Sequence, residues 1–150
     1  MNLDRRQFLT GAAALATGLS ASACAAAAPR APLFRLSLAE WSFHRALFGR
    51  SGPPLTNLEF PRVARELGFE GVEYVNAFFK DKAGDEAYLR ELAKVVAGEG
   101  IVSLLIMCDG EGELGSPDAK QQGQAVENHR RWLDAAAALG CHSIRTNASG

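Results

Sequence analysis

Polar side chains that could bind a hydroxylated molecule recur at four places along the chain, each directly after a short apolar run. Carboxylates accept hydrogen bonds, guanidinium groups donate them, and amides do both, so this set suits a ligand rich in hydroxyl and carbonyl oxygens. No catalytic motif is complete, and no residue is assigned as a catalytic group or a metal ligand. The candidate substrate-binding residues are Glu40, His44, Glu73, Asn76, Asp109, Arg145 and Asn147.

Some of these residues have structural alternatives. Glu73 and Arg145 could pair with each other as neighbouring charges, since an unpaired buried charge is costly. His44 could be a solvated loop residue. Asp109 followed by Gly110 could form a turn.

Seven other residues are interpreted mainly as structural or surface residues. Trp41 could line the face of a sugar or fill the core, and Trp132 is expected to pack. Cys108 is expected to be a small buried residue rather than a nucleophile. Among the remaining ionisable residues, Glu111 and Glu113 are expected to face solvent, and His129 and His142 to be surface or capping residues.

The elements that would position the candidate residues alternate between strand and helix. Phe60, Val63, Ala64 and Leu67 follow the i, i+3, i+4, i+7 pattern of a helix with one buried face. The same reasoning predicts strands at 33–43, 71–76, 101–107 and 142–147, further helices around 89–96 and at 125–139, and loops at 45–58 and 109–124. The strand at 101–107 is a continuous apolar run, which predicts burial on both faces.

An internal repeat supports this layout. The segment 67–75 aligns with 139–147: each begins with Leu-Gly at a helix end, and an aliphatic residue opens the following strand. Glu73 and Arg145 occupy equivalent positions, and period-two alternation places both on the face opposite Val72 and Ile144.

Four strands alternating with three helices correspond to half of an eight-stranded barrel, which needs about 250 residues. We therefore expect an α/β fold, the N-terminal half of a (β/α)8 TIM barrel with parallel strands, over residues 34–150. A small, unusual α/β domain is the alternative. In a barrel the candidate residues would meet at the carboxyl ends of the strands, and the Gly-rich loop at 109–124 would cover the pocket.

Residues 1–28 are predicted to be a twin-arginine export signal, followed by a tether at 29–33. Arg5-Arg6 precedes a weakly hydrophobic core, and Ala21-Ser22-Ala23 fits a cleavage site. A short anchor helix is the alternative, and Cys24 could carry a lipid. The signal implies export to the periplasm through the twin-arginine machinery.

The composition is that of a soluble globular protein, with 47% hydrophobic and 22% charged residues and a net charge of −1. The near-neutral balance argues against a nucleic-acid partner, which a basic face would attract. Three cysteines do not form a disulfide framework.

Four segments together resemble the exported sugar phosphate isomerase/epimerase proteins of the xylose isomerase-like TIM-barrel superfamily: 71–76, 104–112, 125–132 and 139–145. The resemblance implies a divalent ion (Mn, Mg, Zn or Co) held by two glutamates, an aspartate and a histidine, with these ligands expected beyond residue 150. The ion would polarise a sugar carbonyl while carboxylates move a proton between adjacent carbons. Glu73, Asn76, Arg145 and Asn147 match positions that line the barrel mouth in this family.

The expected function is therefore that of the N-terminal part of a metal-dependent sugar isomerase or epimerase. Export favours a free sugar, cyclitol or glycoside as substrate, and a homo-oligomer is possible. The alternatives are a non-catalytic carbohydrate-binding barrel and an endonuclease IV-like phosphodiesterase, which would need more histidines and a basic groove. Four strands alone leave two open edges, so we expect the isolated segment to be inactive, and to be insoluble or to pair with another half.

Overall fold

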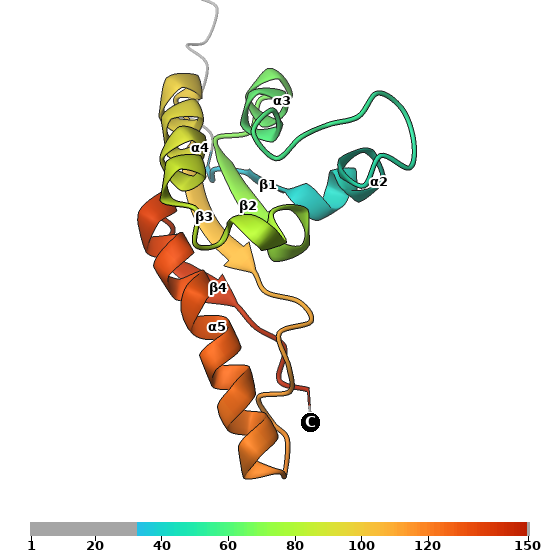
Figure 1. Ribbon diagram of the computed structural model, residues 1–150. Helices are drawn as coiled ribbons and strands as arrows, with labels where there is room; N and C mark the ends of the chain where they lie inside the picture. The colour runs from blue at the N-terminus through green and yellow to red at the C-terminus, as the bar shows by residue number, and fades with distance from the viewer. Residues whose placement is uncertain (1–32, 150) are drawn as a thin grey trace, which may run out of the picture. The chain divides into compact units, whose positions relative to one another are not determined.

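The computed structural model describes residues 33–149, so the predicted export signal and residues 29–32 of the predicted tether lie outside the described residues. Four parallel strands form one sheet in the order β1-β2-β3-β4 (Figure 1). They are β1 (Ser37–Ala39), β2 (Gly71–Val75), β3 (Val102–Met107) and β4 (Ser143–Arg145). The connections carry the helices α2 (His44–Leu47), α3 (Phe60–Glu66), α4 (Glu86–Glu99) and α5 (Ala119–Leu139). This alternation confirms the predicted α/β class and the arrangement of the first half of a barrel.

Two aspartates set the beginnings of the long helices. Asp85 accepts the N–H of Tyr88 at 3.0 Å to cap α4, and Asp118 accepts the N–H of Lys120 at 2.8 Å to cap α5. The cap at Asp118 explains why α5 begins at Ala119 rather than at the predicted Ala125, since a side-chain acceptor satisfies N–H groups of the first turn. None of the helices among residues 33–149 is both long and apolar enough to cross a membrane.

The core lies between the sheet and the layer formed by α3, α4 and α5, which pack side by side (Figure 1). Its centre is aromatic: Phe79 meets Trp132 edge-on at a centroid separation of 5.2 Å and Tyr74 at 6.1 Å. The predicted packing role of Trp132 is confirmed, because its side chain is fully buried. His129, on the same helix, is also buried and places Nδ1 2.7 Å from the Ala125 carbonyl oxygen, so its prediction as a surface or capping residue is wrong.

The two faces of β3 differ in burial. Ser103 and Ile106 are buried beneath the helices, whereas Val102 is 49% exposed and Leu104 only partly buried. Burial on both faces was expected, and for the described residues this is wrong because no described element covers the second face. That face carries Glu73, while Val72 is fully buried in the helix-covered core, as the alternation predicted.

The first strand is much shorter than the predicted 33–43. It ends at Ala39, and Glu40 begins a short 3-10 turn that runs to Phe43. The side chain of Glu40 folds inward, where Oε2 accepts the backbone N–H of Val75 at 2.7 Å and Oε1 accepts Asn57 Nδ2 at 2.5 Å. Because of this turn, Glu40 is not part of β1, and its buried carboxyl group instead forms a hydrogen bond to β2.

Burial dominates the ionisation of Glu40. Its side chain is fully buried, and desolvation raises its pKa to about 8, although the hydrogen bonds from Val75 and Asn57 favour the charged form. The Tyr88 hydroxyl donates to Asn57 Oδ1 at 2.7 Å, so the same network reaches α4.

Replacement of Glu40 by glutamine should flatten the pH dependence of stability. The folded-state pKa lies above the unfolded value of 4.5, so the contribution of Glu40 is fully present below pH 4.5 and is lost as pH rises through about 8. Across that window the free energy of unfolding should fall by up to about 1.4 kcal/mol per pH unit more in the wild type than in Glu40→Gln. Urea unfolding at several pH values measures this. Glu91→Gln, at an exposed position on α4, is the matched control, and parallel curves for wild type and Glu40→Gln would contradict the assignment.

Replacement of Gly112 by alanine should destabilise the fold more than the same change at Gly110. Both glycines have positive φ (100° and 72°), but a Cβ at Gly112 would lie 3.0 Å from Ala125 Cβ, while a Cβ at Gly110 would meet open space. We expect a loss of about 2–3 kcal/mol for Gly112→Ala and about 1 kcal/mol for Gly110→Ala. Denaturant unfolding measures both. Gly98→Ala, in α4 with open space around it, should not destabilise, and equal losses at Gly110 and Gly112 would refute the close approach to α5.

Candidate functional site

Asn76 follows β2 directly and forms two hydrogen bonds with the second residue after β3, Asp109. Its Oδ1 accepts the backbone N–H of Asp109 at 3.0 Å, and its Nδ2 donates to the backbone carbonyl of Asp109 at 2.9 Å. The side chain is fully buried. Asn76 therefore fixes the position of Asp109 at the carboxyl edge of the sheet.

Asp109 gathers two other predicted site residues around its carboxylate. Its Oδ1 accepts Arg145 Nη1 at 3.0 Å and Asn147 Nδ2 at 2.8 Å. Arg145 Nη1 also donates to Asn147 Oδ1 at 2.5 Å, which closes a three-membered cluster. The side chains of Arg145 and Asp109 are 41% and 39% exposed, so the cluster is open to a ligand.

Glu111 is buried, so the expectation that it faces solvent is wrong, whereas its neighbour Glu113 is exposed as predicted. Glu111 Oε1 accepts Asn76 Nδ2 at 2.9 Å and Oε2 accepts Arg131 at 2.8 Å. Burial opposes its ionisation, but the Trp132 indole and the Arg131 guanidinium outweigh it and hold the pKa below the usual value. We assign the larger stabilisation to Arg131, because the Trp132 N–H makes no hydrogen bond of good geometry.

Glu73 and Arg145 do not form the ion pair that was one interpretation of them. Strand β3 lies between their strands, so the two residues are not on neighbouring strands. Glu73 Oε1 instead accepts the Ser37 hydroxyl at 2.5 Å, and Arg145 pairs with Asp109. Glu73 remains partly exposed on the sheet face that no described helix covers.

Glu40 and His44, the two candidates after β1, do not join the cluster. Both carboxylate oxygens of Glu40 accept hydrogen bonds inside the core. The imidazole of His44 is partly buried and stacks on Trp41 at a centroid separation of 5.1 Å. Trp41 is 51% exposed, which excludes a core-filling role for it.

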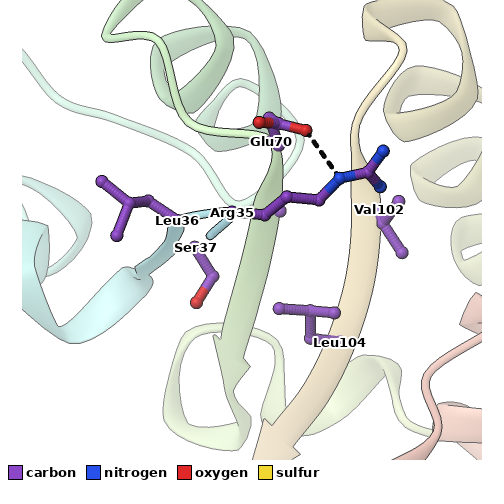
Figure 2. A pocket seen from close by; sticks show the side chains of 7 residues that line it. Arg35, Leu36, Ser37, Glu70, Val102 and Leu104 are labelled. Atoms are coloured by element: carbon purple, nitrogen blue, oxygen red, sulfur yellow. Dashed lines mark ion pairs between the residues drawn. The ribbon is translucent and has the colours of Figure 1, made fainter. Parts of the chain in front are cut away.

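Two hollows lie at opposite ends of the sheet. The one at the carboxyl ends of β3 and β4 has a volume of about 260 Å³ and a polar lining of Cys108, Gly110, Glu111, Gly112, Glu113, His129, Asn147 and Ser149. The other lies at the amino ends of the strands, has a volume of about 160 Å³, and includes Leu36, Val102 and Leu104 (Figure 2). There Arg35 pairs with Glu70 at 3.1 Å across its rim (Figure 2). Because barrel enzymes react at the carboxyl ends of strands, the polar hollow beside Asn147 is the functional candidate.

Cys108 borders that hollow without being reactive. Burial raises the pKa of its thiol to about 12, and the charges of Glu111 and Asp109 act in the same direction. A thiol with this pKa stays protonated at neutral pH, so the prediction of a small buried residue is confirmed.

The described residues do not provide the metal site that the resemblance implies. No group of three or more His, Cys, Asp or Glu side chains among residues 33–149 is arranged to hold a metal ion. Two acidic side chains at the carboxyl edge of the sheet already pair with arginines: Asp109 accepts from Arg145, and Glu111 accepts from Arg131.

Comparison with solved structures finds sugar epimerases with the same fold. The 3-keto-D-glucoside 4-epimerase YcjR from E. coli, in its apo form, matches 61% of this chain at 21% identity with a TM-score of 0.50. A D-psicose 3-epimerase crystallised in the presence of D-fructose also matches 61% of the chain, at 20% identity with a TM-score of 0.53. The match spans 32% of each of those chains. At such identities the likeness shows the fold, and no curated protein sequence matches this chain.

A family model matches the sequence itself. The model of the xylose isomerase-like TIM barrel covers residues 61–149, which is more than half of the chain and includes Asn76, Asp109, Arg145 and Asn147. The sequence match and the parallel four-stranded sheet agree, and the chain belongs to the xylose isomerase-like TIM barrel family.

Proposed function

We propose that the protein containing this chain is a sugar isomerase or epimerase, in which the cluster of Asp109, Arg145 and Asn147 binds substrate oxygens. The observation that carries the proposal is this half-exposed cluster at the carboxyl edge of a sheet in the xylose isomerase-like family. The two epimerases with the same fold support the reaction class.

The proposed reaction moves one proton next to a carbonyl group. A carbonyl makes the neighbouring C–H acidic; a base removes that proton, and its return to the opposite face of the same carbon inverts the centre. Return to the carbonyl carbon, with the hydroxyl proton passing to the carbonyl oxygen, instead interconverts aldose and ketose. The acid and base are not assigned to the described residues.

Binding is the role proposed for the described residues. Asp109 Oδ1 already accepts two hydrogen bonds, so Oδ2 is the oxygen that would accept from a sugar hydroxyl. Arg145 uses Nη1 within the cluster, so Nη2 and Nε would donate to substrate oxygens. Glu73, held by Ser37 on the open sheet face, would accept from a second hydroxyl.

A divalent ion would act as a Lewis acid on the carbonyl oxygen in such a reaction. Since residues 33–149 hold no suitable ligand cluster, we propose that its ligands lie beyond residue 150. Export to the periplasm by the twin-arginine machinery, and a free sugar, cyclitol or glycoside as substrate, are parts of the same proposal, as are a possible lipid on Cys24 and possible self-association.

The full protein should interconvert an unphosphorylated sugar and its isomer or epimer. The test panel is D-psicose, D-fructose and a 3-keto-D-glucoside, with D-fructose 6-phosphate as the phosphorylated comparison, and products are separated by chromatography. Turnover of at least one unphosphorylated sugar is expected. Saturable binding without turnover would favour a non-catalytic carbohydrate-binding barrel, and turnover of the phosphate ester alone would contradict the substrate class.

Replacement of Arg145 by glutamine should raise KM about 10- to 100-fold, because a charge-assisted hydrogen bond to the substrate contributes about 1.5–3 kcal/mol. Initial-rate kinetics on the panel sugar that is turned over measure the change. Arg130→Gln is the matched control, since Arg130 is exposed on α5 and pairs only with Glu127 among the described residues. Equal KM values for Arg145→Gln and the control would remove Arg145 from the binding site.

A further inference from the structure

We infer that Glu111 is a positioning residue for the substrate-binding cluster, acting through Asn76; the inference rests on the proposed function. The carboxylate of Glu111 is buried yet ionised, and it does not bond to any of Asp109, Arg145 and Asn147. Its carboxylate bonds to Asn76 and to Arg131, and of these two it is Asn76 that bonds to a residue of the cluster, Asp109.

Asn76 is the intermediate between Glu111 and the cluster. Its Nδ2 carries two hydrogens, one donated to Glu111 Oε1 at 2.9 Å and one to the Asp109 carbonyl at 2.9 Å. Its Oδ1 accepts the Asp109 N–H at 3.0 Å. All three hydrogen bonds form only when the amide has this orientation.

The charge of Glu111 reinforces that orientation, which the backbone carbonyl and N–H of Asp109 also favour. An ionised carboxylate only accepts hydrogen bonds, so it excludes the flipped amide, in which Asn76 Oδ1 would face Glu111 and the Asp109 carbonyl. Asn76 Oδ1 would then face two other acceptor oxygens, which is unfavourable, and the N–H of Asp109 would lose its acceptor. With Asn76 held by Glu111, the backbone of Asp109 is fixed, and its Oδ1 meets Arg145 and Asn147.

Arg131 keeps the buried charge in place. Its guanidinium reaches Glu111 Oε2 at 2.8 Å from α5, and Asn128, one turn earlier, donates to the Glu111 backbone carbonyl at 3.1 Å. A buried carboxylate without a counter-ion would take up a proton, and protonated Glu111 could donate and would then no longer oppose the flipped amide. Helix α5 is in this way connected to the geometry of the cluster.

The test compares Glu111→Gln in the full protein with Glu113→Gln, an exposed residue of the same loop. Glutamine keeps the shape but can turn its NH2 toward Asn76, so it no longer selects one amide orientation. With D-psicose and a 3-keto-D-glucoside as probes, we expect KM to rise about tenfold in Glu111→Gln with kcat changed less than about twofold, and no change in Glu113→Gln. Combining Glu111→Gln with Arg145→Gln should raise KM no further than Arg145→Gln alone, because both changes disable one cluster.

The outcomes separate this inference from the proposed function. If the KM effects of the two substitutions multiply, or if only Arg145→Gln has an effect, Glu111 does not act through the cluster and the inference is wrong while the function stands. If neither substitution changes KM, the binding role proposed for the cluster fails and the inference fails with it, while turnover of the sugar still supports the reaction class. Should Glu111→Gln not fold, Arg131→Gln is the second variant, with Arg130→Gln as its control, and an unchanged KM in Arg131→Gln would overturn the inference.

Discussion

Backbone N–H groups that lie just beyond the paired part of a strand need hydrogen-bond acceptors, and this need shapes the carboxyl edge of the sheet. Pairing of β1 with β2 stops at Ala39, opposite Glu73, which leaves the N–H of Val75 to the carboxylate of Glu40. Pairing of β2 with β3 stops at Met107, and the N–H of Asp109 is taken by Asn76. A buried N–H without a partner costs about 1–3 kcal/mol, so each strand end must supply an acceptor to the next.

This constraint divides the polar residues of the edge by role. Glu40 and Asn76 are fully buried, and each accepts one backbone N–H, while the second oxygen of Glu40 accepts Asn57 Nδ2, which leaves little to offer a ligand. Asp109, Arg145 and Asn147 bond mainly to one another and stay partly open. The residues that hold the edge together thus follow the first two strands, whereas the cluster proposed to bind substrate follows the third and fourth strands, with Glu73 on β2 as a further proposed contact.

The fold was predictable because its signals are local. The Leu-Gly ends at Gly68 and Gly140, both with positive φ, mark where helices stop, and β2 begins at Gly71 as predicted. The site was less predictable because residue type does not show whether an acid turns toward backbone, helix or ligand. The burial of Glu111 depends on Arg131, which lies 20 residues later on α5, and period-two alternation does not predict that contact.

Hydrogen exchange of two backbone amides in the intact protein tests the strand-end constraint most directly. The amides of Val75 and Asp109 are expected to exchange as slowly as those inside β2 and β3, since each donates to a buried side-chain acceptor. The amide of Gly110, an exposed residue next to Asp109, is the internal reference for fast exchange. Exchange at Val75 and Asp109 as fast as at Gly110 would show that Glu40 and Asn76 do not hold the strand ends.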